Sequence, residues 1–256
     1  MTDNQINFTR TVNKHTEIAD NGAFFCCSSG AESVFNLYYW YTQEISNSAD
    51  VYCIYFFHSD TNSIKNTIPE YLSFKRLMKT FSKANYDIIF MNTKYISRWM
   101  QFYLFFAAQY AVNSLNSRLV YCKEDRTVQA MDYYKTWIIT GQTLEEKNRI
   151  DHIDEKSDKI IESSIKQISN NETEIWNISS DYYKHEALAM LPKDLRQCIW
   201  TCHKPIDKGD HYKGCEECVK CTELQDAYKK ADLSHVPQYI EKTQDSYTKA
   251  AMLLSE

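Results

Sequence analysis

The feature that most constrains this chain is a group of cysteines near its C-terminus. Cys215, Cys218 and Cys221 form two overlapping Cys-x-x-Cys units, and Cys202 lies upstream of them. Four thiolates with this spacing can meet at one tetrahedral point, which is the arrangement that a structural Zn²⁺ requires. The sequence therefore predicts a zinc site formed by Cys202, Cys215, Cys218 and Cys221.

Two other readings of these cysteines are a redox pair and reduced thiols that only pack. A redox Cys-x-x-Cys usually opens a helix inside a βαβ pattern, whereas this triplet follows a polar loop over 204–214 and precedes a charged helix expected over 222–230. Zinc is the better explanation. Cys198, His203 and His211 remain alternatives to Cys202 as the fourth ligand.

Composition limits the class of protein. A chain of 256 residues can bury a sizeable core, and its net charge of -5 argues against nucleic acid as the main partner. Residues 1–20 contain no apolar signal segment, and no run reaches the roughly 20 apolar residues of a membrane span. We therefore expect a cytoplasmic protein with no membrane partner.

Short apolar runs alternate with helical patterns along the chain. This alternation predicts an α/β fold with a parallel sheet covered on both faces. We expect a nucleotide-binding α/β domain over 1–195 and a zinc-binding helical lobe over 196–256, packed as one unit. The predicted strands are 23–27, 51–57, 86–91, 119–122 and 175–178, and the predicted helices are 68–82, 96–115, 133–141, 145–168 and 184–191, followed by an amphipathic tail over 236–256.

A turn of small residues follows the first apolar strand. Ser28-Ser29-Gly30-Ala31-Glu32-Ser33 leads directly into a helical pattern. In such a turn the backbone N–H groups and the helix N-terminus point at the same anion, which is a phosphate-binding geometry. The alternative is an ordinary connection with a serine N-cap and an acidic first turn.

The turn and the cysteine group together resemble the 7-cyano-7-deazaguanine synthases (the QueC family), which are N-type ATP-pyrophosphatases. Their loop reads Ser-Gly-Gly-x-Asp-Ser, and their C-terminal part has a lysine at a helix start before a four-cysteine zinc knuckle. Ser28–Ser33, Lys184 and the cysteines occupy these places. The chain departs from the family at Ser29 and Glu32, at Trp99-Met100 in place of Arg-Asn, and at 122–125, where the glycine of Gly-x-x-x-Asp is lost.

The resemblance implies a Rossmann-like sandwich of the adenine nucleotide α-hydrolase type. It also implies an activity in queuosine biosynthesis. ATP with Mg²⁺ would bind at Ser28, Ser29, Gly30, Ala31, Glu32 and Ser33, with Lys184 and Asp125 as catalytic residues. The carboxylate of a 7-deazaguanine would be adenylated and converted to an amide and then a nitrile, while zinc stays structural. The alternative is a catalytically inactive relative that binds a nucleotide, a modified base or a protein partner; a homodimer is a further expectation.

Overall fold

The computed structural model describes residues 12–13, 21–42, 49–58, 64–82, 84–91, 117–122, 127–132, 135–140 and 172–242, with the single residues 159, 163, 166 and 167. Its main body is a five-stranded sheet in the order β4-β3-β2-β7-β8. Every neighbouring pair in this sheet is parallel. The α/β class and the parallel sheet are thus confirmed. The strands are β2 (Asn21–Cys26), β3 (Ala49–His58), β4 (Asn85–Met91), β7 (Lys135–Thr140) and β8 (Glu172–Asn177).

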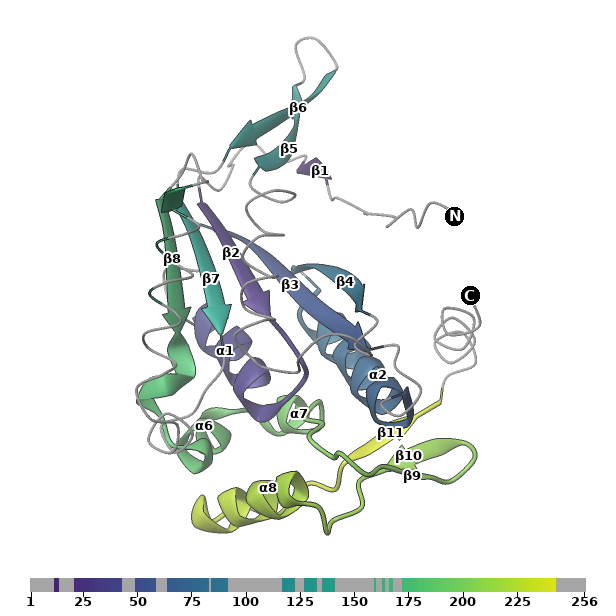
Figure 1. Ribbon diagram of the computed structural model, residues 1–256. Helices are drawn as coiled ribbons and strands as arrows, with labels where there is room; N and C mark the ends of the chain where they lie inside the picture. The colour runs from purple at the N-terminus through teal and green to yellow at the C-terminus, as the bar shows by residue number, and fades with distance from the viewer. Residues whose placement is uncertain are drawn as a thin grey trace.

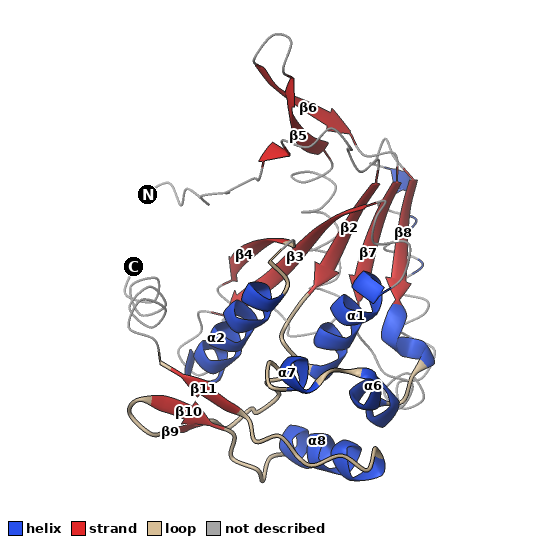
Figure 2. Cartoon of the chain, turned by 180° about the vertical axis from the view of Figure 1, so that it is seen from behind, coloured by secondary structure: helices blue, strands red, loops and turns tan. Residues whose placement is uncertain are grey.

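Two helices cover one face of this sheet (Figures 1 and 2). Helix α1 (Ala31–Thr42) connects β2 to β3, and α2 (Ile64–Thr80) connects β3 to β4. Both crossovers move along the sheet in the same direction. Because parallel crossovers are right-handed, they place their helices on the same side.

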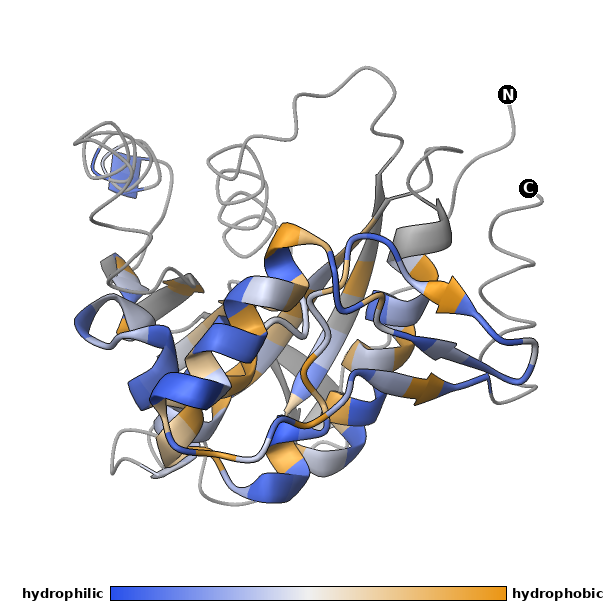
Figure 3. Cartoon of the chain, turned by 90° about the horizontal axis from the view of Figure 1, so that it is seen from below, coloured by the Kyte–Doolittle hydropathy of each residue, from blue (hydrophilic) through white to orange (hydrophobic). Residues whose placement is uncertain are grey.

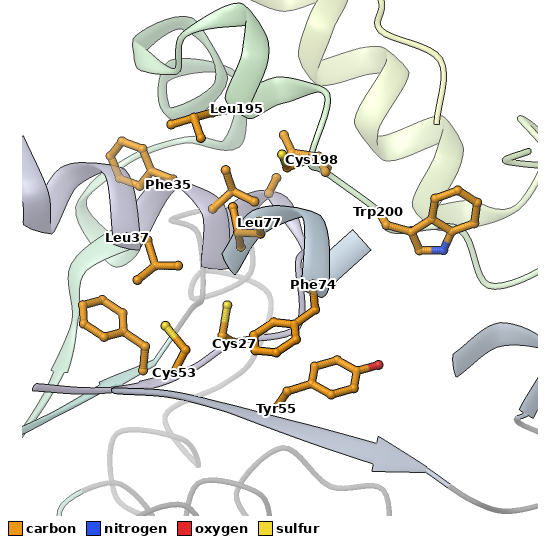
Figure 4. Close-up of a cluster of buried hydrophobic side chains, with 14 of the residues drawn as sticks. Cys27, Phe35, Leu37, Cys53, Tyr55, Phe74, Leu77, Leu195, Cys198 and Trp200 are labelled. Carbon is orange, nitrogen blue, oxygen red and sulfur yellow. The ribbon is translucent and has the colours of Figure 1, made fainter. Parts of the chain in front are cut away.

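The core between these helices and the sheet is rich in aromatic side chains. Phe25 meets Trp40 edge to face, and Tyr55 stacks on Phe74. Leu195 and Cys198, from much later in the chain, belong to the same buried cluster (Figure 4). The C-terminal part is therefore built onto the sheet core.

The predicted strand over 119–122 exists but does not join the main sheet. Strand β5 (Ser117–Cys122) pairs in parallel with β1 (Val12–Asn13) and antiparallel with β6 (Thr127–Asp132). This three-stranded sheet lies beyond the amino ends of the main strands (Figure 1). The placement of 119–122 in the parallel sheet was wrong, because a strand's own sequence does not specify its partner.

The predicted helix over 133–141 was also wrong. Residues 135–140 form β7, an inner strand that pairs with both β2 and β8. Its sequence is Lys-Thr-Trp-Ile-Ile-Thr, in which β-branched and aromatic residues predominate. Such residues favour strands, so the residue types over 135–140 indicate the observed strand and not the predicted helix.

The C-terminal lobe lies at the carboxyl ends of β2, β3, β7 and β8 (Figure 1). Seen from below, its helices alternate hydrophilic and hydrophobic residues (Figure 3). The N–H of Trp200 donates to the carbonyl of Ser29, which joins the lobe to the turn after β2. The elements are the 3-10 helix η3 (Ile178–Asp181), helices α6 (Lys184–Met190), α7 (Lys193–Arg196) and α8 (Val219–Lys230), and strands β9 (Ile206–Asp207), β10 (His211–Lys213) and β11 (Tyr239–Glu241).

Several predictions lie outside the described residues: the helix over 96–115, nearly all of the charged helix over 145–168, and the tail beyond residue 242. Asp125 and the pair Trp99-Met100 are among them. Within the described segments, no helix combines the length and the apolarity needed to cross a membrane.

Candidate metal centre and adjoining cleft

The four predicted cysteines come together at one point. The sulfur atoms of Cys202, Cys215, Cys218 and Cys221 all lie within 4.8 Å of one another. For a tetrahedral ion bonded to sulfur at about 2.3 Å, neighbouring sulfurs lie about 3.8 Å apart. The Cys202–Cys215 and Cys215–Cys221 sulfur distances, 3.6 and 4.0 Å, fall on either side of that value. These cysteines are therefore placed to hold a metal ion.

Local backbone structure brings the sulfurs together. The hairpin of β9 and β10 returns the chain so that Cys215 meets Cys202. Glu216, inside the Cys-x-x-Cys turn, has a left-handed φ of 64°. This turn aims the N–H of Cys218 at the sulfur of Cys215, 3.3 Å away. Cys221 then follows in the first turn of α8.

Backbone N–H groups also prepare the sulfurs to carry negative charge. The N–H groups of Lys204 and Cys215 each lie 3.3 Å from the sulfur of Cys202. Burial opposes ionisation of Cys218, but hydrogen bonds from the backbone of His203 and Cys221 and from neighbouring thiols lower its pKa to about 6. Thiolates are the form that binds metal, so this environment suits an ion.

Burial disfavours ionisation of the other two buried thiols, Cys202 and Cys221. Burial raises the pKa of Cys202 to about 11, and it raises the pKa of Cys221 as well. A bound metal ion is the local charge that reverses such a shift and deprotonates a coordinating thiol. A metal ion held by the four sulfurs would therefore keep these two groups as thiolates.

Gln238 holds the two halves of the centre together, and sequence analysis missed it. Its side-chain oxygen accepts from the N–H groups of Thr201 and Cys202, while its Nε2 lies 3.4 Å from the sulfur of Cys221. Its carbonyl accepts from the N–H of Gly214, where an added Cβ would come within 3.1 Å of the Gln238 side chain. A lone glutamine beyond a helix carries no recognisable signal, because only the fold brings it to the cysteines.

The three alternative ligands lie elsewhere. Cys198 is buried beneath the lobe, with its sulfur 4.0 Å from the hydroxyl of Thr80. His203 is exposed. The ring of His211 contacts Asp210 and Tyr239. Among the described residues, the group that could hold a metal ion contains Cys202 and none of these three.

The turn after β2 forms the floor of a cleft beside the metal centre. Ser29 has a φ of 58° and is fully buried, and its hydroxyl donates to the carbonyl of Glu70 at 3.3 Å. The N–H of Ser28 donates to the hydroxyl of Ser33 at 3.1 Å. Ala31 is buried as the first residue of α1. The turn is thus a fixed structure closed by its own serines.

The cleft has a volume of about 140 Å³. Its walls are formed by the turn, by α2 and α6, and by the segments that carry the cysteines. Three of the lining residues, Thr201, His203 and Lys220, are direct sequence neighbours of Cys202 or Cys221. The lining residues are Ser28, Gly30, Glu32, Glu70, Lys184, Trp200, Thr201, His203, Lys220 and Leu224.

Lys184 reaches into this cleft from the start of α6 and meets Glu32. Their charged atoms lie 2.8 Å apart, and the two side chains are only 12% and 15% exposed. Glu223 lies further away, at 4.0 Å from Lys184, and also pairs with Lys220 at 3.2 Å. The predicted site residues Glu32 and Lys184 are thus brought together, as an ion pair.

No family matches this chain. No protein-family model matches it, and no curated protein matches it in sequence. The cleft and the metal centre therefore have to be interpreted from their own chemistry.

Glu70 is a second cleft residue that sequence analysis missed. It lies on α2, and burial raises the pKa of its carboxyl to about 8. Carboxyl groups with raised pKa values in a cleft are common at functional sites. A single glutamate inside a helical pattern looks like a solvated residue in sequence, so the packing of α2 on the turn was needed to reveal it.

Proposed function

We propose that this protein binds the phosphates of ATP at Ser28–Ser33 and uses ATP to adenylate a carboxylate of a 7-deazaguanine. The observation that carries the proposal is the cleft in which the turn after β2 faces Lys184. Open α/β sheets bind ligands outside the carboxyl ends of their strands, where the strand order reverses. Strand β2, between β3 and β7, lies at that point. The fold would then be the Rossmann-like sandwich of the adenine nucleotide α-hydrolases.

Each wall of the cleft has a part in this proposal. The first N–H groups of α1 have no partner within their own helix and would face the phosphates, with the hydroxyls of Ser28 and Ser33 beside them. Lys184 would balance the phosphate charge. The cleft is smaller than the roughly 300–1,000 Å³ of a whole ligand pocket, so it suits the phosphates, with Mg²⁺ arriving on the nucleotide. Asp125 keeps its proposed catalytic role, outside the described residues.

We assign the metal centre to Zn²⁺ in a structural role. Four cysteine ligands complete a tetrahedral zinc ion and leave no position for water or substrate. Thr201, His203 and Lys220 line the cleft next to these ligands. The ion would therefore fix one wall of the cleft without taking part in the reaction.

The reaction follows from the resemblance to the 7-cyano-7-deazaguanine synthases. The carboxylate of 7-carboxy-7-deazaguanine attacks the α-phosphorus of ATP, and pyrophosphate leaves. Ammonia then displaces AMP and gives the amide. The amide oxygen then attacks the α-phosphorus of a second ATP and pyrophosphate leaves; AMP departs with that oxygen as the nitrogen loses its protons, which gives the nitrile. Such steps depend mainly on positioning and on electrostatic stabilisation of the phosphates.

The test is calorimetric titration of the zinc-loaded protein with ATP and Mg²⁺, followed by an assay for AMP and pyrophosphate with 7-carboxy-7-deazaguanine. We expect binding and substrate-dependent AMP formation. Lys184→Met should weaken nucleotide binding at least tenfold, since it removes a charge-assisted contact. The matched control is Lys193→Met, at an exposed lysine of α7 outside the cleft, which should leave binding unchanged. Absence of nucleotide binding would contradict the proposal.

A second candidate is a protein that binds a nucleotide, a modified base or a protein partner without turnover. The observation that favours it is the ion pair between Glu32 and Lys184, since the lysine is already neutralised by a residue of the turn itself. Nucleotide binding without AMP formation, for every carboxylate offered, would select this candidate.

A further inference from the structure

The Glu32 carboxylate lies against the turn at Gly30. Its Oε2 is 3.2 Å from the position that a Cβ on Gly30 would take, and the hydroxyl of Ser28 is 3.4 Å from that position. The carboxylate is therefore folded back over the turn. An acidic group in the first turn of a helix is also favoured by the helix dipole, as a phosphate would be.

Lys184 is paired with acidic side chains at the edge of the cleft. Its side chain is 12% exposed, and removing the partner of a charge buried to this degree is strongly unfavourable. Glu32, at 2.8 Å, supplies that partner, and Glu223, at 4.0 Å, is a weaker one. A phosphate that approaches Lys184 from the side of the turn would compete with the Glu32 carboxylate for this ammonium group.

We infer that Glu32 is an internal counter-ion that occupies the anion position of the cleft and competes with phosphate for Lys184. This inference rests on the proposed phosphate site and adds to it a residue that sets which ligands enter. An anion with no more charge or oxygen atoms than a carboxylate does not displace the Glu32 side chain from Lys184. A ligand with several phosphate oxygens, which also engages the turn and the start of α1, does.

The experiment uses inorganic pyrophosphate as the probe and the zinc-loaded full chain in buffer without added Mg²⁺. Affinity is measured by calorimetry for the unchanged protein, Glu32→Gln and the control Glu223→Gln. The control removes a carboxylate that lies 4.0 Å from Lys184, pairs with Lys220 at 3.2 Å and does not line the cleft. We expect Glu32→Gln to bind about tenfold more tightly, the order expected when one partly screened like charge is removed. Glu223→Gln should change affinity less than threefold.

Two further readings separate competition from a structural role. Glu32→Gln should lower the thermal midpoint of the ligand-free protein while it tightens binding, and a purely structural residue would give only the first change. Adding Lys184→Met to Glu32→Gln should remove the gain. If Glu32→Gln destabilises the fold too far, Glu32→Asp keeps the charge, shortens the reach to Lys184 and should give an intermediate gain.

Equal or weaker pyrophosphate binding by Glu32→Gln, with binding by the unchanged protein, would overturn the inference and leave the phosphate site in place. A gain of the same size in Glu223→Gln would also overturn it, because the effect would then be one of general charge. No binding by any variant would remove the phosphate site and the inference together.

Discussion

At the scale of single residues, Ser29 has a strained backbone conformation in the turn that forms the floor of the cleft. It holds a left-handed φ of 58° without being glycine, which costs on the order of 1–3 kcal/mol. Two hydrogen bonds keep it there, from its hydroxyl to the carbonyl of Glu70 and from the N–H of Trp200 to its own carbonyl. A glycine at this position would hold the same conformation without strain.

Glycine usually makes a folded protein less stable than alanine does, but at position 29 we expect the opposite: Ser29→Gly should be more stable than Ser29→Ala. Both lose the hydroxyl, worth about 1 kcal/mol. Only glycine relieves the backbone strain, so the glycine variant should be about 1 kcal/mol more stable than the alanine variant. Urea unfolding measures the difference. An alanine variant as stable as the glycine variant would mean that the turn relaxes out of the left-handed region.

Glu70 should make stability depend on pH. Burial raises its pKa from 4.5 to about 8 in the folded protein, so the folded state holds this proton more tightly than the unfolded state does. Its contribution to the free energy of unfolding is complete below about pH 4.5. It is then lost as the pH rises to about 8, by at most about 1.4 kcal/mol per pH unit.

The check on Glu70 is a series of unfolding measurements between pH 5 and pH 9 on the unchanged protein and Glu70→Gln. The glutamine variant should lose less stability over this range. A matched control is Glu217→Gln, at an exposed position, which should keep the original pH dependence. Parallel curves for all three proteins would show that Glu70 ionises freely in the fold.

At the scale of elements, the sequence predicted those strands whose apolar runs are continuous. Ala23–Cys27 and Val51–Phe57 correspond to β2 and β3 because strands buried on both faces have no polar alternation. The same absence of alternation hid β7, whose Trp137-Ile138-Ile139 run fits a buried helix equally well. Pairing was out of reach for β5, because its partners come from distant segments.

The residues of the candidate site also fall into those that the sequence predicted and those that it did not. The cysteine ligands could be predicted because their spacing is itself the signal, and Lys184 and Glu32 were predicted through motif positions. Their mutual ion pair was not predicted. Gln238 contacts Thr201, Cys202 and Cys221, and Glu70 lies on α2 against the turn at Ser29. These contacts depend on tertiary packing that no local pattern encodes.

Removal of the metal should loosen the lobe before the sheet. The cysteines connect the segment before β9, the β9–β10 hairpin and α8, so chelation removes their common anchor. We expect faster amide exchange over 200–242, with α1, β2 and β3 still protected. The turn at Ser29 should also open, because Trp200 donates to it. Hydrogen exchange with and without a chelator measures this, and unchanged exchange in the lobe would contradict a stabilising metal.

At the scale of the whole molecule, Arg76 on α2 connects the lobe to the sheet body. Its guanidinium donates to the carbonyl of Gln197 and to that of Tyr239, both at 3.0 Å. These two carbonyls flank the metal centre along the chain. One side chain thus fixes the angle at which the lobe meets α2, beside the buried bond from Ser73 to the carbonyl of Cys198.

Arg76→Ala should lower the free energy of unfolding by about 1–2 kcal/mol, because two charge-assisted but exposed hydrogen bonds are lost. Arg76→Lys should recover less than half of this, since an ammonium group cannot span both carbonyls as the planar guanidinium does. Lys79→Ala, at an exposed position on the same helix, is the control. Equal stability of all variants would show that the lobe docks without Arg76.

The hydrogen bond between Trp200 and Ser29 has a consequence for synthesis on the ribosome. The turn is synthesised well before the segment that fixes it, because all five strands of the main sheet precede Trp200 in the chain. Local helices and the first strands can form during translation, but the cleft is complete only after the segment that contains Trp200 has emerged. A chain cut before Trp200 would thus keep the strands of its main sheet and lack a finished cleft.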